Sequence, residues 1–494
     1  MKTPNTAEPH YWSATETLDA LNARRIGAVE ILDHYLARLS RHGDKVNAVV
    51  ERDIERARAA AAEADARRAA GKAGPLDGLP MTIKDTFEVR GFKTTAGIPD
   101  LAGYRPEDDA DAVARLRGAG AVIYGKTNVP VAASDHQSYN PIYGTTRNPW
   151  NPDRCVGGSS GGSAAALAAG FSALELGSDI GGSIRIPSHY CGVYGHKPTY
   201  GIVSARGHIP PAPGELSAAP LSVCGPLARS AEDLELALGL LAGPGGATAN
   251  AWSLALPKAR HNHLKDFRVA VWTGGYPVDD TYAALIEEFA GNLEREGASV
   301  TRLAKTPDHL EGTDALYLDM LFGVIGSGSP EAELAAYKAV ADGKPAGSYE
   351  ARLARATHQS LRDWAGLASR QAKLFADWEQ WFSNFDVLLC PVSMNVAFPH
   401  MTEDGHGPIA QLNRTLSVSG GKRPYLDNLL WPGVATLGHL PSTVRPLDGR
   451  VDGMPAGIQI MGAQLEDHTT IRFAQLCDEA FGGFSAPELS ATEA

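Results

Sequence analysis

The residues of this chain best suited to nucleophilic chemistry lie in the glycine- and serine-rich stretch 157–197. Residues 157–162 read GGSSGG, and a second glycine pair precedes a serine at 181–183. A serine hydroxyl attacks poorly until a base takes its proton, and glycines let successive N–H groups point at one spot, as an oxyanion hole requires. Asp179 and Arg185 flank the second group. The same composition is typical of turns, so composition alone leaves a catalytic and a structural loop equally open.

Strands and helices are expected to present these residues. Residues 173–177 predict a strand that leads into the second glycine pair, and residues 163–169 predict a helix directly after the first. Polar backbone groups then converge at a positive helix end. Residues 81–85 (MTIKD) predict another short strand, which ends in Lys84 and Asp85.

Two other motifs compete for the chemistry. Residues 120–127 match the phosphate-loop pattern G-x-x-x-x-G-K-[ST], but their centre, AVIY, favours a strand over a flexible anion cradle. Residues 158–162 match the nucleophile-elbow pattern G-x-S-x-G on Ser160. An esterase triad on Ser160 would need an acid and then a histidine, which chain order allows from the residues Asp386, His439 and His468. We keep both motifs as minority alternatives.

A metal site is not expected. His261 and His263 form the only close histidine pair, they lie in a polar turn, and the H-E-x-x-H pattern is missing. We therefore expect neither a metal nor a cofactor.

Composition indicates an ordinary globular enzyme. Of 494 residues, 44% are hydrophobic and 21% are charged, which allows a sizeable core. The net charge of −12 and the lack of a basic run argue against nucleic-acid binding. Five scattered cysteines, no signal-like start and no run of 18 apolar residues predict a reduced, cytoplasmic protein without membrane contact.

Alternating strands and helices predict an α/β fold with a large, mixed but mostly parallel sheet covered by helices on both faces. A capping box at residues 13–16 begins the first helix. We expect further helices near 28–41, 47–71, 111–117, 230–241, 279–296 and 467–480, and over most of 329–382. Strands are expected near 121–124, 267–272, 298–303, 385–389, 434–446 and 456–461, and a long loop at 393–426.

Taken together, several motifs of the chain resemble those of the amidase signature family. The resemblance rests on LPMTIKD at 79–85, GKTN at 125–128, GTTRNP at 144–149, the Gly/Ser core and DGMPAGIQ at 452–459. These landmarks stand in the family's order from about residue 75 to residue 470. The resemblance implies an N-terminal helical region at 1–74, the signature core with the catalytic residues at 75–243, and the rest of the same α/β domain at 244–494.

The resemblance also implies site residues. The family's base falls on Lys84, its bridging serine on Ser159 and its nucleophile on Ser183. The oxyanion hole would be the backbone N–H groups of four consecutive residues, Ile180, Gly181, Gly182 and Ser183. Three further residues would support the loop, namely Ser160, Asp179 and Arg185. Two departures from the family pattern, His196 and the run GHLP at 438–441, leave this machinery intact.

Such a triad makes a physical demand on Lys84. A lysine is a base only when it is neutral, and its ordinary pKa is about 10.4. To act as a base near neutral pH, Lys84 needs a pKa that is lower by roughly three units, and burial can cause this decrease. Lys84 must then be enclosed without a paired carboxylate, so Asp85 must point away from it. Ser159 would link the amine to Ser183 by short hydrogen bonds.

The implied reaction is hydrolysis of an amide of a small molecule through an acyl-enzyme on Ser183. An esterase or carbamate hydrolase with the same triad, the A subunit of a tRNA-dependent amidotransferase, and a catalytically idle scaffold remain alternatives. A homodimer is left open. The pocket is expected from 134–143, 316–330 and 393–432, where Phe398, Tyr425 and Trp431 could face an aryl group, although each could equally belong to the core.

Overall fold

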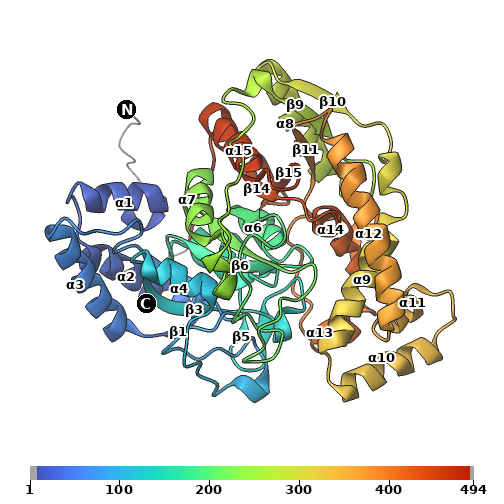
Figure 1. Ribbon diagram of the computed structural model, residues 1–494, viewed down its shortest axis with the longest axis horizontal. Helices are drawn as coiled ribbons and strands as arrows, with labels where there is room; N and C mark the ends of the chain where they lie inside the picture. Colours follow the sequence, from blue (N-terminus) through green and yellow to red (C-terminus); the bar gives the residue numbers. More distant parts are fainter. Residues whose placement is uncertain (1–7, 490–494) are drawn as a thin grey trace.

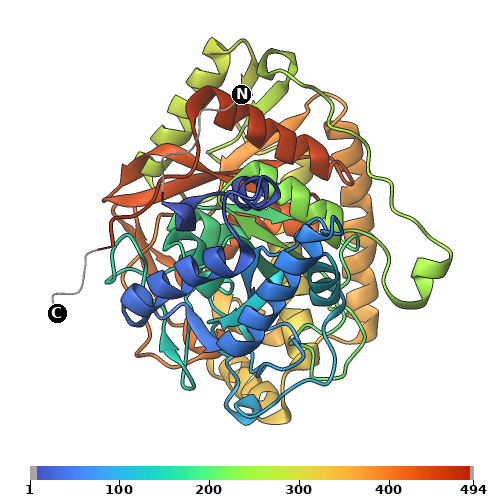
Figure 2. The same ribbon diagram turned by 90° about the vertical axis from the view of Figure 1, so that its left-hand side faces the viewer.

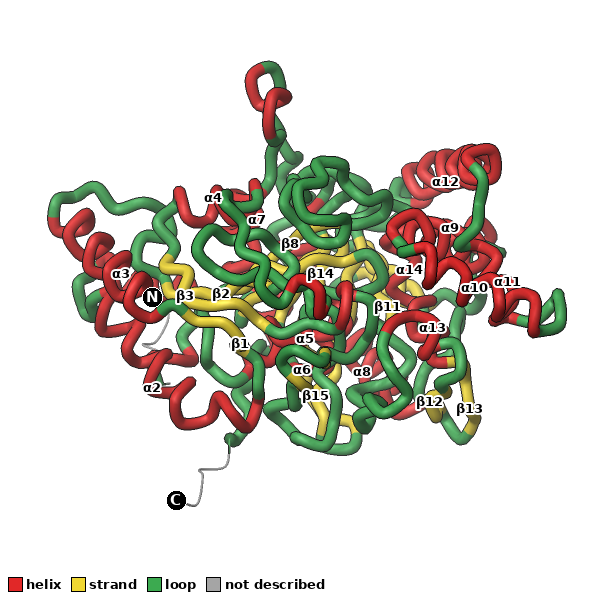
Figure 3. The backbone as a smooth tube through the Cα atoms, turned by 90° about the horizontal axis from the view of Figure 1, so that it is seen from below, coloured by secondary structure: helices red, strands yellow, loops and turns green. Residues whose placement is uncertain are grey.

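A computed structural model describes residues 8–489 of the chain. Within this part, an eleven-stranded mixed sheet crosses the molecule and carries helices on both faces (Figures 1 and 3). In order across the sheet, its strands are β1 (Val49–Arg52), β3 (Val122–Thr127), β2 (Pro80–Lys84), β6 (Glu175–Asp179), β8 (Val223–Ala228), β7 (Tyr194–Lys197), β14 (Ser442–Val451), β15 (Met454–Met461), β11 (Val387–Pro391), β9 (Arg268–Val271) and β10 (Ser299–Arg302). The predicted α/β class and mixed sheet are confirmed.

The expectation that the sheet is mostly parallel is wrong. Among the described strands, four neighbouring pairs are parallel, β2 with β3 and β6, and β9 with β10 and β11. The other six pairs are antiparallel. The reason is that the hairpin β14–β15 and the antiparallel strands β7 and β8 fill the centre, between two parallel groups. The alternation of strands and helices along the chain predicts only the parallel groups, because their strands are joined by helical crossovers.

The helices of the described residues are α1 (Ala14–Asn22), α2 (Ala28–Val46), α3 (Ile54–Ala69), α4 (Asp111–Gly118), α5 (Gly161–Ala168), α6 (Arg185–Cys191), α7 (Ala231–Leu241), α8 (Asp280–Arg295), α9 (Thr313–Gly328), α10 (Glu331–Gly343), α11 (Tyr349–Ala356), α12 (Leu361–Trp381), α13 (Gly407–Gln411), α14 (Leu430–Leu437) and α15 (Asp467–Phe481). Helices α1–α3 lie at one end of the molecule and α9–α12 at the other (Figure 1). Helix α15 packs beside α7 (Figure 2).

Local sequence signals explain the helix starts near the N-terminus. Ser13 accepts the Glu16 N–H, and the Glu16 side chain accepts from Ser13 N, so the predicted capping box is present. Asp53 accepts the Arg56 N–H and so starts α3 at Ile54. The expected helix over 47–71 is therefore wrong in its first turn, where β1 pairs antiparallel with β3 as the edge strand of the sheet.

The C-terminal part also departs from expectation in two places. Residues 434–446 hold the end of α14 and only then the start of β14, instead of one strand. Helix α14 is buried throughout and β14 is buried over 442–447, and a run that is buried on all sides carries no periodicity that separates a helix from a strand. The expected loop at 393–426 contains α13 and the hairpin of β12 (Thr415–Val418) and β13 (Gly421–Pro424).

The sheet order determines where the functional residues meet. Strands β2 and β6 are parallel neighbours, with Thr82 opposite Glu175 and Ile83 opposite Leu176. Their carboxyl ends carry Lys84 and Asp179, and polar residues at such ends share one edge of the sheet. The loop after β6 then leads directly into α6.

Two further observations concern the class of protein. All five cysteines are buried and free. Within residues 8–489, none of the helices is both long enough and apolar enough to span a membrane.

Candidate active site

Lys84 is completely buried at the end of β2. Its Nζ lies 2.7 Å from Ser159 Oγ and 2.8 Å from Ser178 Oγ. Burial lowers the pKa of Lys84 to about 7, while the charges of Asp179 and Cys224 act in the opposite direction. Near neutral pH the side chain therefore exists in part as a free amine, which is the form that can accept a proton.

Asp85 points away from Lys84. Its carboxylate accepts hydrogen bonds from Lys126 Nζ at 3.1 Å and from Thr95 Oγ1 at 2.5 Å. Asp85 and Lys126 are both completely buried, so the two charges compensate each other inside the protein. This pairing leaves Lys84 without an adjacent carboxylate that would hold the proton on its amine.

The two other residues of the predicted triad lie on neighbouring loops. Ser159 is 1% exposed and precedes α5, and Ser183 is 6% exposed and precedes α6. The N–H of Ser160 donates to the carbonyl of Ser183 at 3.0 Å, which holds the loops together. The peptide bond between Gly158 and Ser159 is cis.

The structure thus brings Ser159 to Lys84 but records only half of the expected relay. The described residues contain no hydrogen bond between the hydroxyls of Ser159 and Ser183. Catalytic hydrogen bonds are often long before substrate binds, so this geometry alone does not remove Ser183 as a candidate.

Three of the four predicted oxyanion donors are free. The N–H of Gly182 is already taken, because it donates to Asp179 Oδ1 at 2.9 Å. The N–H groups of Ile180, Gly181 and Ser183 have no acceptor among residues 8–489. Gly182 has φ of +98°, and a Cβ there would stand 2.9 Å from the Pro432 side chain, so only glycine fits.

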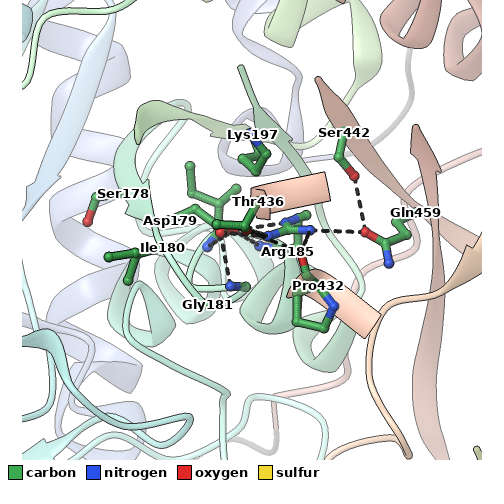
Figure 4. Close-up of polar contacts among 12 residues, drawn as sticks. Ser178, Asp179, Ile180, Gly181, Arg185, Lys197, Pro432, Thr436, Ser442 and Gln459 are labelled. Atoms are coloured by element: carbon green, nitrogen blue, oxygen red, sulfur yellow. Dashed lines mark hydrogen bonds and ion pairs between the residues drawn. The ribbon is translucent and has the colours of Figure 1, made fainter. Parts of the chain in front are cut away.

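Asp179 and Arg185 form a buried ion pair that braces this loop (Figure 4). Arg185 donates to both carboxylate oxygens of Asp179, at 2.8 and 3.0 Å. Burial alone would raise the pKa of Asp179, but the charge and hydrogen bonds of Arg185 hold it below its usual value. Arg185 also donates to Pro432 O, Thr436 Oγ1 and Gln459 Oε1, which ties the loop to α14 and β15.

Two side chains from other segments of the chain, Tyr317 and His136, orient the same loop. Tyr317 on α9 donates its hydroxyl to the carbonyl of Ile180 at 3.0 Å. His136 Nε2 lies 2.9 Å from the carbonyl of Gly181. In a trans peptide the carbonyl and the next N–H point in opposite directions, so the Tyr317 contact turns the Gly181 N–H to the other side of the loop.

Sequence reasoning missed Ser178 and His208, and it placed His136 and Tyr317 only within the expected pocket segments 134–143 and 316–330, with no role of their own. His208 is connected to Lys84, because its Nε2 lies 2.8 Å from Ser178 Oγ. The place of Ser178 near the end of β6 could have pointed to it, once β6 is known to neighbour β2. The individual contacts of His136, Tyr317 and His208 join distant segments of the chain, and no local pattern marks such contacts.

The competing motifs find no support in the geometry. Residues 122–127 form strand β3, and Lys126 is bound within the core. Ser160 Oγ donates to the carbonyl of Ser178 at 3.3 Å. Its proposed partners lie in other contacts: Asp386 binds Arg260 and Arg268, His439 stacks on Tyr200, and His468 contacts Glu235.

His261 and His263 do not form a metal site in the described part of the chain. His261 contacts Asp386. In residues 8–489, no group of three or more His, Cys, Asp or Glu side chains is arranged to hold a metal ion.

The aromatic side chains expected in the pocket are buried. Phe398 packs between Tyr190 and Tyr425, and Trp431 packs on Trp272 with its indole N–H donated to Pro277 O. A surface pocket lined by Arg302, Lys305 and Trp381, among others, contains none of the candidate catalytic residues or their hydrogen-bond partners. We therefore place no substrate in that pocket.

Comparisons with known proteins agree with this architecture. The family model described as Amidase matches residues 30–471. In Roseiflexus sp. (strain RS-1), the A subunit of the glutamyl-tRNA(Gln) amidotransferase is 32% identical over 94% of this chain and 95% of its own length.

Two solved structures are similar over nearly the whole chain. One is described as part of an unexpected vestigial protein complex that reveals the evolutionary origins of an s-triazine catabolic enzyme. It is 28% identical, with a TM-score of 0.80 over 97% of this chain and 100% of its own. A structure described only as an amidase is 28% identical, with a TM-score of 0.74 over 95% of this chain and 99% of its own. With the family model matched over most of its length, the chain belongs to the amidase signature family of hydrolases.

Proposed function

We propose that this protein is an amidase that hydrolyses a linear carbon–nitrogen amide bond through an acyl-enzyme on Ser183. The observation that carries the proposal is the buried contact of 2.7 Å between Lys84 Nζ and Ser159 Oγ. This contact connects a buried amine, whose pKa burial lowers to about 7, to a hydroxyl on the loop beside Ser183. Membership of the amidase family supports the reaction class.

The proposed reaction has two halves. Ser183 Oγ attacks the amide carbonyl while its proton passes through Ser159 to Lys84, and the carbonyl oxygen becomes an anion that the free N–H groups of the loop can bind. The proton then returns to the nitrogen, the carbon–nitrogen bond breaks, and the amine leaves. Water next attacks the acyl-enzyme with the same base, which releases the carboxylic acid and restores Ser183.

The bridging hydroxyl has a clear physical purpose. An amide nitrogen is a poor leaving group unless it is protonated as the bond breaks. A single neutral amine that receives the Ser183 proton and gives it back can serve both steps. Ser159, held by Lys84 before α5, is the group that would carry the proton between them.

A substrate screen with a matched variant tests the proposal. We expect the wild-type protein to hydrolyse at least one class among p-nitroanilides, primary amides, carbamates and esters, and Ser183→Ala to lose that activity. A fluorophosphonate probe, which reacts with activated serines, should label the wild type and leave Ser183→Ala unlabelled. Labelling of Ser183→Ala, or its full activity, would contradict the assignment of the nucleophile.

The second candidate is the A subunit of an amidotransferase, which is favoured by the identity of 32% to a protein of that name. Purification from the native cell under gentle conditions distinguishes the two. A stoichiometric partner needed for activity would support the amidotransferase, whereas hydrolysis by the purified chain alone supports the stand-alone amidase. The net charge of −12 gives no sign of a surface for tRNA, and we therefore prefer the amidase.

A further inference from the structure

Lys84 has a second hydroxyl partner that the proposed reaction does not use. Ser178 Oγ lies 2.8 Å from Lys84 Nζ and also 2.8 Å from His208 Nε2. The other ring nitrogen of His208, Nδ1, lies 2.9 Å from the carbonyl oxygen of Pro210. These contacts form a chain that runs from a backbone carbonyl to the amine.

The direction of every hydrogen bond in this chain follows from its far end. A carbonyl oxygen can only accept, so Nδ1 of His208 must carry the hydrogen. In the neutral ring Nε2 is then an acceptor, and the Ser178 hydroxyl must donate to it. The Ser178 oxygen is left as an acceptor for an N–H of Lys84.

This polarity decides where the lone pair of the amine points. A neutral amine has two N–H bonds and one lone pair, and its N–H toward Ser178 leaves the lone pair for another partner. Ser159, at 2.7 Å, is the other hydroxyl in contact. Without an acceptor at His208, the Ser178 hydroxyl could instead donate into the lone pair and occupy the base.

We propose that His208 is a positioning residue of this active site, which acts through Ser178 to keep the lone pair of Lys84 directed at Ser159. The inference rests on the proposed function, in which Lys84 is the base.

The fold holds His208 firmly in this place. Its segment pairs with Phe87 in an antiparallel bridge directly after β2, and the Ile209 N–H donates to Thr86 O at 2.7 Å. The ring meets Phe87 edge-on, with centroids 5.0 Å apart. Burial, and then the charge of Lys84, lower the pKa of His208 to about 3, so the ring stays neutral where the enzyme works.

The charged and titratable groups around this chain of contacts are few. Asp179 and Cys224 act on Lys84, and Lys84 acts on His208. Asp179 is held by Arg185, and burial raises the pKa of Cys224 to about 12, so neither group changes charge near neutral pH. The effect of His208 on the amine therefore comes from hydrogen-bond direction and is not a second titration.

The test measures the rate at which an alkyl fluorophosphonate labels Ser183 in the full-length protein. We expect His208→Leu, which cannot accept a hydrogen bond, to slow labelling by about 100-fold. His208→Gln should recover most of the rate, because its carbonyl oxygen can accept from Ser178 and its amide can donate to Pro210. If His208→Leu does not fold, His208→Asn replaces it, since Asn is too short to reach Ser178.

Two further measurements separate positioning from simple packing. In a Ser178→Ala background, His208→Leu should add little, because residues that act through one contact are not additive. The slower labelling should also persist at alkaline pH. If His208 only kept water out, its loss would raise the pKa of Lys84, and the full rate would return as the amine lost its proton.

The inference is overturned if His208→Leu labels at the wild-type rate, if its rate recovers fully at alkaline pH, or if its effect multiplies with that of Ser178→Ala. Lys84→Ala is measured in parallel. Rapid labelling of Lys84→Ala would overturn the proposed function itself, whereas slow labelling of Lys84→Ala beside normal labelling of His208→Leu would overturn this inference alone.

Discussion

Lys84 Nζ and Ser159 Oγ lie 2.7 Å apart, and both side chains are shielded from water. The lysine lies at the end of strand β2 and the serine lies in the loop before helix α5, so secondary structure positions both groups. The adjacent carboxylate, Asp85, is occupied by Lys126. Within residues 8–489, the side-chain hydrogen-bond partners of the amine are therefore the hydroxyls of Ser159 and Ser178 and not a carboxylate, which is the environment that a neutral base needs.

Removal of the amine is expected to remove most of the activity. Lys84→Ala should lower the rate of acylation by about 100- to 10,000-fold, the range that a general base contributes. Stopped-flow measurement of the first turnover with an ester or anilide substrate gives this rate. Lys126→Ala is a poor control because it leaves the buried Asp85 carboxylate unpaired, whereas Lys45, which is exposed in the last turn of α2, offers a better one. Equal loss in Lys45→Ala would mean that the effect is not specific to the base.

Tyr317→Phe tests the orientation of the oxyanion loop. Loss of the hydroxyl frees the carbonyl of Ile180 and lets the Gly181 N–H turn from its position, so kcat should fall about 10-fold while KM changes little. Tyr337→Phe is a matched control, because Tyr337 is equally buried and its hydroxyl has no hydrogen-bond partner among the described residues. A change confined to KM would instead assign Tyr317 to substrate binding.

Gly182→Ala should abolish turnover without preventing folding of the rest of the chain. Its φ of +98° disfavours alanine, and the new Cβ would meet Pro432 at 2.9 Å. The loop must shift, and with it the backbone groups beside Ser183. Gly239→Ala is the control, because a Cβ there meets nothing within 4 Å in helix α7. Wild-type kcat in Gly182→Ala would show that this loop does not bind the oxyanion.

The ion pair of Asp179 and Arg185 predicts a dependence of stability on pH. Loss of Arg185 leaves a buried carboxylate unpaired, and Arg185→Ala should cost about 3–5 kcal/mol in urea unfolding. The pKa of Asp179 is lower in the folded protein than in the unfolded chain. Its contribution is therefore present above the unfolded pKa of about 3.9 and is lost as the pH falls through the folded pKa.

The variant Asp179→Asn tests the predicted direction of this pH dependence. It lacks the titrating group, so the difference in unfolding free energy between wild type and variant should shrink as the solution becomes strongly acidic. A difference that grows in acid would contradict the assignment. Arg302→Ala, which breaks an exposed pair with Glu294, should change the unfolding free energy little.

The α/β class and the large mixed sheet could be predicted from the sequence, but the order of the strands could not. Lys84, Ser159 and Ser183 belong to one ordered set of motifs, so the sequence alone nominates them; the structure brings Ser159 to Lys84, and the catalytic roles stay a prediction. Strand order is different, because β8 and the hairpin β14–β15 enter the middle of the sheet by pairings that no local pattern encodes. The expectation of a mostly parallel sheet therefore fails, although individual strands such as β2 and β9 are predicted.

The same reason explains which site residues the sequence does not reveal. Ser178 and His208 reach Lys84 only because β6 neighbours β2 and because a later loop pairs beside Phe87. Tyr317 reaches the carbonyl of Ile180 from a helix that lies 137 residues further along the chain. Contacts of this kind depend on the tertiary structure, and a single sequence contains no signal of them.

The central claim is that Lys84 is neutral when it acts, and the pH dependence of acylation tests it most directly. The rate of Ser183 labelling by a neutral fluorophosphonate should rise with pH through a midpoint of about 7, because loss of the Lys84 proton creates the base. Lys197 needs a control, since burial lowers its pKa to about 7 as well, yet its Nζ donates to Pro198 O and to no serine in the described part of the chain. The account predicts that this midpoint persists in Lys197→Met and disappears in Lys84→Met. A midpoint that persists in Lys84→Met would contradict it.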